Sequence, residues 1–166
     1  MNITKSIAAI ATGLVLSIAP AQARLEDETG DLIRLLQSNG INVVINGERC
    51  DGTVHGSYQF LGLRRQLNLC PGESIDAKDH ETVRHEAIHV LQHCINVSRG
   101  TAVTTPIMDM DTLVQAVNSN LPADVVAFVK SAYPQDQWAI EMEANLMARQ
   151  ATSVEIMKWF SQACTF

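Results

Sequence analysis

Positive charge is scarce in this 166-residue sequence, which has 12 lysines and arginines against 18 aspartates and glutamates. No basic stripe is visible, and this argues against nucleic acid as the main partner. The one long apolar run, residues 7–18, is too short to span a bilayer, and no second run follows it. The sequence also lacks internal repeats, low-complexity segments and any C-x-x-C pair, which weakens the case for a cysteine zinc site.

Residues 1–23 have the pattern of a secretory signal peptide. A lysine near the start is followed by the apolar run 7–18 and by Ala-Gln-Ala at 21–23, a small-x-small cleavage site. We therefore expect cleavage after Ala23 and a secreted or periplasmic location. The remaining residues, 24–166, are long enough for one domain with a single core.

Residues 85–89 read His-Glu-Ala-Ile-His, the H-E-x-x-H arrangement of zinc hydrolases. Residues four apart lie on one face of an α-helix about one turn apart, so both imidazoles can bind a single metal ion. Glu86 follows the first histidine and is placed to take a proton from an attacking water. The motif predicts His85 and His89 as metal ligands and Glu86 as the catalytic base.

The flanks of this motif predict a helix. Asp76 and Asp79 are candidate N-caps, and from about His80 no proline or glycine occurs before Gly100. Apolar residues recur three and four positions apart and make one stripe suited to burial. For His80 and for His93, the other histidines of this segment, we expect a hydrogen-bonded structural role. The stripe consists of Val83, Ala87, Val90, Leu91 and Cys94.

A catalytic zinc site needs a third protein ligand. After His89 the only histidine is His93, and the glycine of the long H-E-x-x-H-x-x-G-x-x-H form is missing, so the ligand must be a carboxylate. Segment 138–148 supplies Glu141 and Glu143 on a second helix that is apolar over much of its circumference, so an acid there should be buried with a partner. Glu143, two residues on, faces roughly away from Glu141 and is the alternative ligand.

On this second helix the sequence resembles the glutamate-zincins, the thermolysin-like and ImmA/IrrE-like metallopeptidases, which carry Glu-x-x-(Ala/Ser)-(Asn/Asp). Glu141, Ala144 and Asn145 match that pattern position by position. The resemblance covers the two helices only. It implies that Glu141 binds zinc together with His85 and His89, and that Asn145 orients one of these histidines through a hydrogen bond.

Four cysteines occur, and an even number in an exported chain favours two disulfides. Three pairings are possible. We favour Cys50–Cys70 across an antiparallel pair of strands, and Cys94–Cys164 between the end of the metal-site helix and the C-terminal segment.

The remaining patterns predict an α+β fold: a short antiparallel or mixed sheet, then the H-E-x-x-H helix and a helical C-terminal half. This order is the zincin layout. By resemblance, an edge strand of that fold lies beside the cleft and can pair with an extended peptide, and residues 56–70 are the candidate for it. Helices are expected at 25–38 and at about 109–118, 122–132, 135–150 and 152–163, and strands at 41–45, 56–60 and 64–70.

These features predict an exported zinc metallopeptidase that acts on a peptide or protein substrate. His85, His89 and Glu141 would hold Zn²⁺, and Glu86 would act as general base. Two other hypotheses remain: a zincin-like binding protein whose metal only stabilises the packing of two helices, and a helical domain that is stabilised by disulfides and holds no metal. An intact Glu86 counts against the first of these, because a structural site has no use for a base. Candidates for oxyanion stabilisation are His80, Tyr58 and Tyr133.

Overall fold

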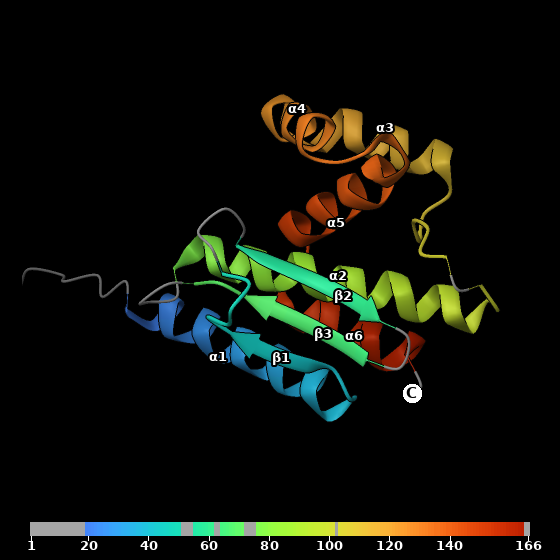
Figure 1. Cartoon of the computed structure of the whole chain (residues 1–166). Helices are drawn as coiled ribbons and strands as arrows, with labels where there is room; N and C mark the ends of the chain where they lie inside the picture. The colour runs from blue at the N-terminus through green and yellow to red at the C-terminus, as the bar shows by residue number, and fades with distance from the viewer. Residues whose placement is uncertain (1–18, 51–54, 62–63, 72–75, 102, 165–166) are drawn as a thin grey trace, which may run out of the picture.

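The protein has an α+β fold of three strands and six α-helices in the residues that the computed structural model describes, namely 19–50, 55–61, 64–71, 76–101 and 103–164 (Figure 1). A 3₁₀ turn, η1, precedes the fifth helix. The element bounds are α1 Ala19–Ser38, β1 Asn42–Ile45, β2 Gly56–Leu61, β3 Arg64–Leu69, α2 Ala77–Ser98, α3 Met110–Asn120, α4 Ala123–Ala132, η1 Gln135–Gln137, α5 Trp138–Gln150 and α6 Ser153–Ala163.

The predicted elements are all present, with their ends shifted by a few residues. The largest shift is in α1, which begins at Ala19 rather than at residue 25 and therefore includes the expected cleavage site at 21–23. The rest of the predicted signal peptide, residues 1–18, lies outside the described residues. Within the described part of the chain, no helix has both the length and the apolar character needed to cross a membrane.

The sheet has the strand order β1–β3–β2, with β1 parallel and β2 antiparallel to β3. Leu67 at the centre of β3 pairs with Val43 on one side and with Tyr58 on the other. The expectation that all of 56–70 forms the edge beside the cleft is therefore wrong for β3. β2 is an edge strand, but β1 occupies the far side of β3 and makes it the central strand.

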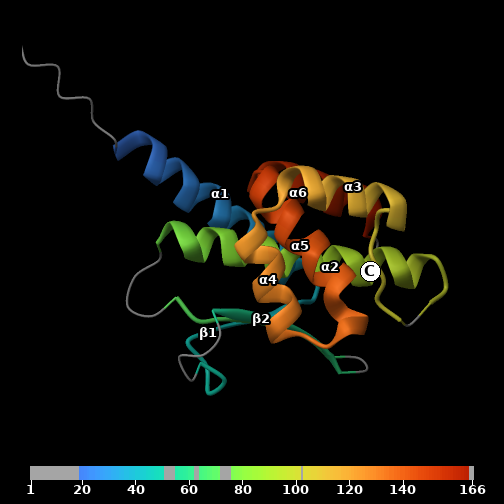
Figure 2. The ribbon, with the colours of Figure 1, turned by 90° about the horizontal axis from the view of Figure 1, so that it is seen from above.

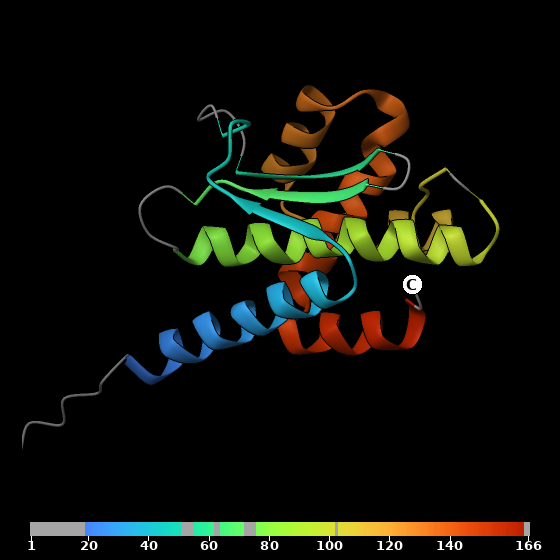
Figure 3. The same ribbon diagram turned by 60° about the horizontal axis from the view of Figure 1, so that its bottom comes forward.

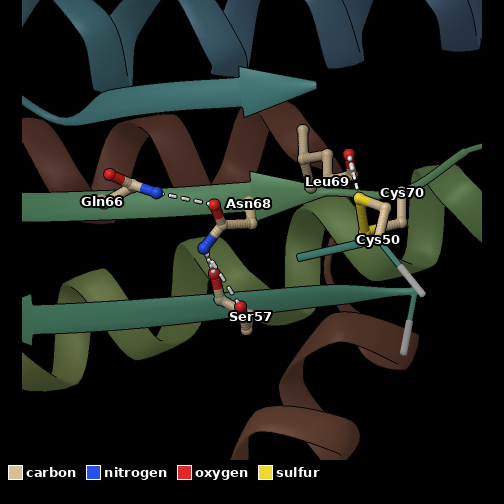
Figure 4. Close-up of a disulfide and its surroundings, with 6 residues drawn as sticks. All are labelled: Cys50, Ser57, Gln66, Asn68, Leu69 and Cys70. Atoms are coloured by element: carbon tan, nitrogen blue, oxygen red, sulfur yellow. Dashed lines mark hydrogen bonds between the residues drawn. A yellow bond between two sulfur atoms is a disulfide. The ribbon is translucent and has the colours of Figure 1, made fainter. Parts of the chain in front are cut away.

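Helices cover the sheet on one face only, as Figures 1 and 3 show. Leu67 and Leu69 point into the main core between the sheet and the helices. Because side chains alternate along a strand, Asn68 points to the opposite face. There it accepts a hydrogen bond from Gln66 Nε2 at 2.7 Å and donates to Ser57 Oγ at 3.2 Å, a polar ladder across β3 and β2 (Figure 4).

Helix α2 is the centre of the fold and contacts α1, α5, α6, β2 and β3. It lies between the sheet and the pair α1 and α6 (Figure 3). Of the two candidate N-caps, Asp76 is the N-cap, and Asp79 completes a capping box with it. The Asp76 side chain accepts from the backbone N–H of Asp79, and the Asp79 side chain accepts from that of Asp76. Helices α3 and α4 pack on α5 and form a separate layer (Figure 1), which overlies the other helices in the view from above (Figure 2).

Both favoured disulfides form. Cys50–Cys70 joins the segment after β1 to the end of β3 (Figure 4), and because β1 runs parallel to β3, the expectation that this bridge crosses an antiparallel pair is wrong. Cys94–Cys164 joins α2 to the C-terminal end of α6. No described cysteine is free. Two disulfides are compatible with an extracellular location.

Candidate metal centre

His85 and His89 lie on successive turns of α2 and face the same point. Their rings are edge to face with centroids 4.6 Å apart, and their Nε2 atoms are separated by 3.0 Å. Glu141 approaches from α5, with Oε2 3.3 Å from His85 Nε2 and Oε1 3.4 Å from His89 Nε2. The three side chains offer ligand atoms that all lie within 4.8 Å of one another, so the group could hold a metal ion.

Polar contacts at both ends of α5 fix it against α2. Near the start of α5, Gln92 Nε2 donates to the carbonyl of Ile140 at 3.1 Å, and near its end Arg84 Nε donates to the carbonyl of Ala148 at 2.8 Å. Ala144 and Ala148 are fully buried, and their small side chains allow the two helices to approach closely. Glu141 is thereby held over the turn of α2 that carries the histidines.

The charges of the group are strongly coupled. Burial disfavours the ionised form of Glu141, but hydrogen bonding to His85 and His89 outweighs burial and lowers the pKa of Glu141 to about 2. Burial likewise disfavours the charged imidazole of His89, but Glu141 and the charge of Glu86 outweigh it and raise the pKa of His89 to about 9.

One buried carboxylate oxygen of this region, Glu86 Oε2, has no hydrogen-bond partner among the described residues, and Glu141 Oε2 has only its 3.3 Å contact with His85 Nε2. Buried polar atoms are almost always paired, and an orphan in a native structure points to a water or an ion. A metal ion against Glu141 with a water beside Glu86 would satisfy both oxygens. The donor set and the unpartnered Glu86 Oε2 therefore fit a metal site with a water beside it.

Glu86 lies one residue beyond His85 and is directed toward the start of β2. Its side chain is buried, and this burial raises its pKa, while the nearby His85 and His89 partly offset the shift. A carboxyl with a raised pKa is suited to take up and release a proton.

A cleft with a volume of about 470 Å³ opens beside these residues. Helix α2 contributes His85 and Glu86 to its lining, and the other walls come from the start of β2, from α4 and from α5. The full lining is His55, Gly56, Lys78, Glu81, Thr82, His85, Glu86, Asp124, Val125, Phe128, Tyr133, Asn145 and Arg149.

Among the three candidates for oxyanion stabilisation, Tyr133 is the one that lines this cleft. Burial and the negative charges of Glu141 and Glu86 raise the pKa of Tyr133 to about 12, so its phenol is a neutral donor at physiological pH. His80 is instead hydrogen-bonded through Nδ1 to Thr29 Oγ1 at 2.8 Å, the structural role expected for it. Tyr58 packs near His93, with ring centroids 6.2 Å apart.

His93 is buried, but its contacts are apolar rather than the hydrogen bond expected. Its ring lies 4.0 Å from that of Phe60, and its Nε2 has no partner among the described residues. The sequence could not show this, because Phe60 comes from β2 and meets α2 only in the folded chain.

Glu143, the alternative third ligand, is fully buried and hydrogen-bonded to groups outside the histidine pair. Its carboxylate accepts from Gln92 Nε2 at 2.8 Å and from the backbone N–H groups of Ile107 at 2.8 Å and Met108 at 2.7 Å. Both acids of the second helix are thus buried with partners, as expected, and it is Glu141 that lies beside the histidines.

The hydrogen bond implied for Asn145 is made by a different residue. Asn145 Nδ2 donates to the backbone carbonyl of Glu141 at 2.9 Å, within its own helix. His89 Nδ1 instead contacts Gln92 Oε1 at 2.8 Å. Sequence reasoning missed Gln92, although a polar residue three positions after His89 on one helix is within reach of it.

The histidine pair, the two buried carboxylates and the cleft are the features from which a function for this chain can be inferred. Comparisons with protein-family models, with curated proteins and with solved structures find no match for it.

Proposed function

We propose that the protein is an exported zinc metallopeptidase. The observation that carries the proposal is the convergence of His85, His89 and Glu141, with ligand atoms within 4.8 Å of one another, beside a cleft that Glu86 also lines. Two imidazoles and one carboxylate are a donor set that suits Zn²⁺ in catalytic sites, which keep an open position, whereas structural zinc sites are closed by four protein ligands.

A bound zinc ion would supply Lewis acidity, which lowers the pKa of a water toward neutrality and polarises a carbonyl. Glu86 accepts the proton that the attacking water loses. It then delivers this proton to the nitrogen of the scissile amide, so that the C–N bond breaks with a neutral amine as leaving group. The buried Glu86, with its raised pKa and unpartnered Oε2, is suited to both transfers.

Tyr133 is the proposed donor to the carbonyl oxygen, which gains negative charge when the water attacks. Its phenol lines the cleft, and with a pKa of about 12 it keeps its proton. A donor aimed at developing charge in a site with restricted water access stabilises the transition state more than the ground state.

An extended peptide or protein segment is the proposed substrate. β2 is an edge strand, and Gly56 at its start also lines the cleft, so a peptide that pairs with this strand would lie beside Glu86. The pattern of residues 1–23 and the two disulfides support the proposed export.

The test compares the zinc-loaded mature protein with its Glu86→Gln variant on a library of unstructured peptides, analysed by mass spectrometry. The parent should cleave peptides in a chelator-sensitive manner, and Glu86→Gln should keep its zinc while losing ~100-fold or more of the activity. Equal cleavage by both proteins would assign the activity to another base or to a contaminant. A folded, zinc-loaded parent that cleaves nothing would favour the binding-protein alternative, and a parent without affinity for zinc would favour the metal-free one.

A further inference from the structure

The fully buried amide of Gln92 connects the two helices of the metal centre. Its oxygen, Oε1, lies 2.8 Å from His89 Nδ1 on its own helix. Its nitrogen, Nε2, donates to Glu143 Oε2 at 2.8 Å and to the backbone carbonyl of Ile140 at 3.1 Å, both on α5. All the amide's contacts with α5 are therefore made by its nitrogen.

These partners leave one orientation for the Gln92 amide. A backbone carbonyl such as that of Ile140 can only accept a hydrogen bond. Both oxygens of Glu143 are also acceptors, because each receives a backbone N–H, from Ile107 or from Met108. The NH₂ group must face them, so the carbonyl oxygen must face His89.

The orientation of Gln92 in turn determines which nitrogen of His89 carries a proton. Since Gln92 Oε1 can only accept, Nδ1 of His89 must be the donor. A neutral imidazole has one N–H, so the lone pair is then on Nε2, the atom that lies 3.0 Å from His85 Nε2 and 3.4 Å from Glu141 Oε1.

We propose that Gln92, itself held by Glu143, is the positioning residue that presents the Nε2 lone pair of His89 to the metal. The inference rests on the metal site of the proposed function. Glu143 is two residues beyond Glu141 on α5, so the hydrogen bonds of Gln92 link His89 to the helix that carries Glu141. Partners of this kind orient the ring of a ligating histidine and increase its basicity.

The test uses Gln92→Met, which is close in shape but removes both hydrogen-bonding ends. We expect its zinc affinity, measured by competition with a chromophoric chelator, to fall 10- to 100-fold. The matched control is Asn96→Leu, one turn further along α2. Asn96 is also a buried amide, but its side chain bonds to Thr105 and to the backbone carbonyl of Gln92, and neither to a histidine nor to the Gln92 amide. Its replacement should therefore leave the zinc affinity within about threefold of the parent.

A second measurement begins with the parent alone, so its first part does not require a variant to fold. In the zinc-loaded parent labelled with ¹⁵N on its histidines, the NMR spectrum should show His89 bound to zinc through Nε2, with a solvent-protected Nδ1–H. In Gln92→Met that proton should exchange faster with water, a change that loss of packing elsewhere on α2 would not cause.

Each possible result either supports or overturns the role of Gln92. Parental affinity in Gln92→Met, or an equal loss in Asn96→Leu, would overturn the role of Gln92 and leave the metal site standing. Should Gln92→Met not fold, zinc on Nδ1 of His89 in the parent would overturn the role, and zinc on Nε2 with a protected Nδ1–H would support it. A parent that binds no zinc would remove the metal site and this inference together.

Discussion

Gly56 at the start of β2 is in direct contact with Glu86 on α2. A Cβ atom at position 56 would lie 3.0 Å from Glu86 Cγ, 3.1 Å from Glu86 Oε1 and 2.7 Å from Thr82 Cγ2. A Cβ atom at these distances requires Thr82 or Glu86 to shift, so glycine lets the edge strand pass close to the proposed base without displacing either side chain. The position of the strand and the position of the Glu86 carboxylate therefore depend on each other.

Gly56→Ala should reduce catalysis without removing the metal. The added methyl group would meet Thr82 Cγ2 most closely and the Glu86 side chain next, so we expect both to shift. Small misplacements of a catalytic group cost ~10- to 100-fold in rate. We expect kcat/KM to fall by about that factor, with zinc affinity unchanged because Gly56 contacts no ligand. Steady-state kinetics and chelator competition would measure the two effects. Gly30→Ala in α1, where the nearest neighbour is the Arg34 side chain at 3.4 Å, is the control, and parental activity in Gly56→Ala would refute the prediction.

Tyr133→Phe should lower kcat while leaving zinc affinity close to that of the parent. The substitution removes one donor to the carbonyl oxygen, and the loss of such a donor costs ~100-fold or more in kcat. Tyr58→Phe is the matched control, because the hydroxyl of Tyr58 is buried without a partner among the described residues. Its removal should leave both activity and folding stability unchanged or improved. Equal effects of the two substitutions on kcat would contradict the role of Tyr133.

Replacement of each acid of α5 by glutamine should affect a different property: zinc affinity for Glu141, and the free energy of unfolding for Glu143. Glu141→Gln replaces a ligand oxygen and should reduce zinc affinity by more than ~100-fold. Glu143→Gln leaves one of three N–H donors without an acceptor, which should cost about 1–3 kcal/mol of the free energy of unfolding. Its effect on zinc affinity, transmitted through Gln92, should be at most ~10-fold. Urea unfolding with chelator present and zinc titration measure these quantities, and the reverse pattern would exchange the roles of the two acids.

Stability of the metal-free protein should fall with rising pH. The pKa of His89 is raised from 6.5 in the unfolded chain to about 9 in the fold. Its contribution to stability is therefore fully present below pH 6.5 and is lost as the pH rises through 9. Zinc must displace the same proton, so zinc affinity should increase by up to ~10-fold per pH unit in that window.

Melting temperatures from pH 6 to 9.5, with chelator and with excess zinc, would test the predicted fall in metal-free stability and the predicted rise in zinc affinity. The metal-free protein should melt at lower temperature as the pH rises, while the gain on adding zinc should grow. His89→Asn removes the titrating ring and should flatten the metal-free curve across this range. A parent whose metal-free melting temperature does not change over these pH values would contradict the assignment to His89.

Local features of the fold follow from the sequence. The Asp76 cap, the apolar stripe of α2 and the spacing of His85 and His89 act within a few residues, so helix and motif can be predicted without knowledge of the rest of the chain. The same holds for Glu141, because two residues along a helix turn the side chain of Glu143 to another face. The α+β order also follows from local patterns, and the number of cysteines predicts two disulfides but does not choose among the three pairings.

Relationships between elements were decided by the tertiary structure. Which strand is at the edge depends on β1 pairing in parallel with β3, and the orienting residue of His89 is Gln92 rather than Asn145 because α5 crosses α2 where Ile140 and Glu143 meet that amide. The desolvation of Glu86 depends on a glycine thirty positions earlier in the chain. The physical reason is common to all three: burial and hydrogen-bond partners are set by contacts between distant segments, and local periodicity carries no information about them.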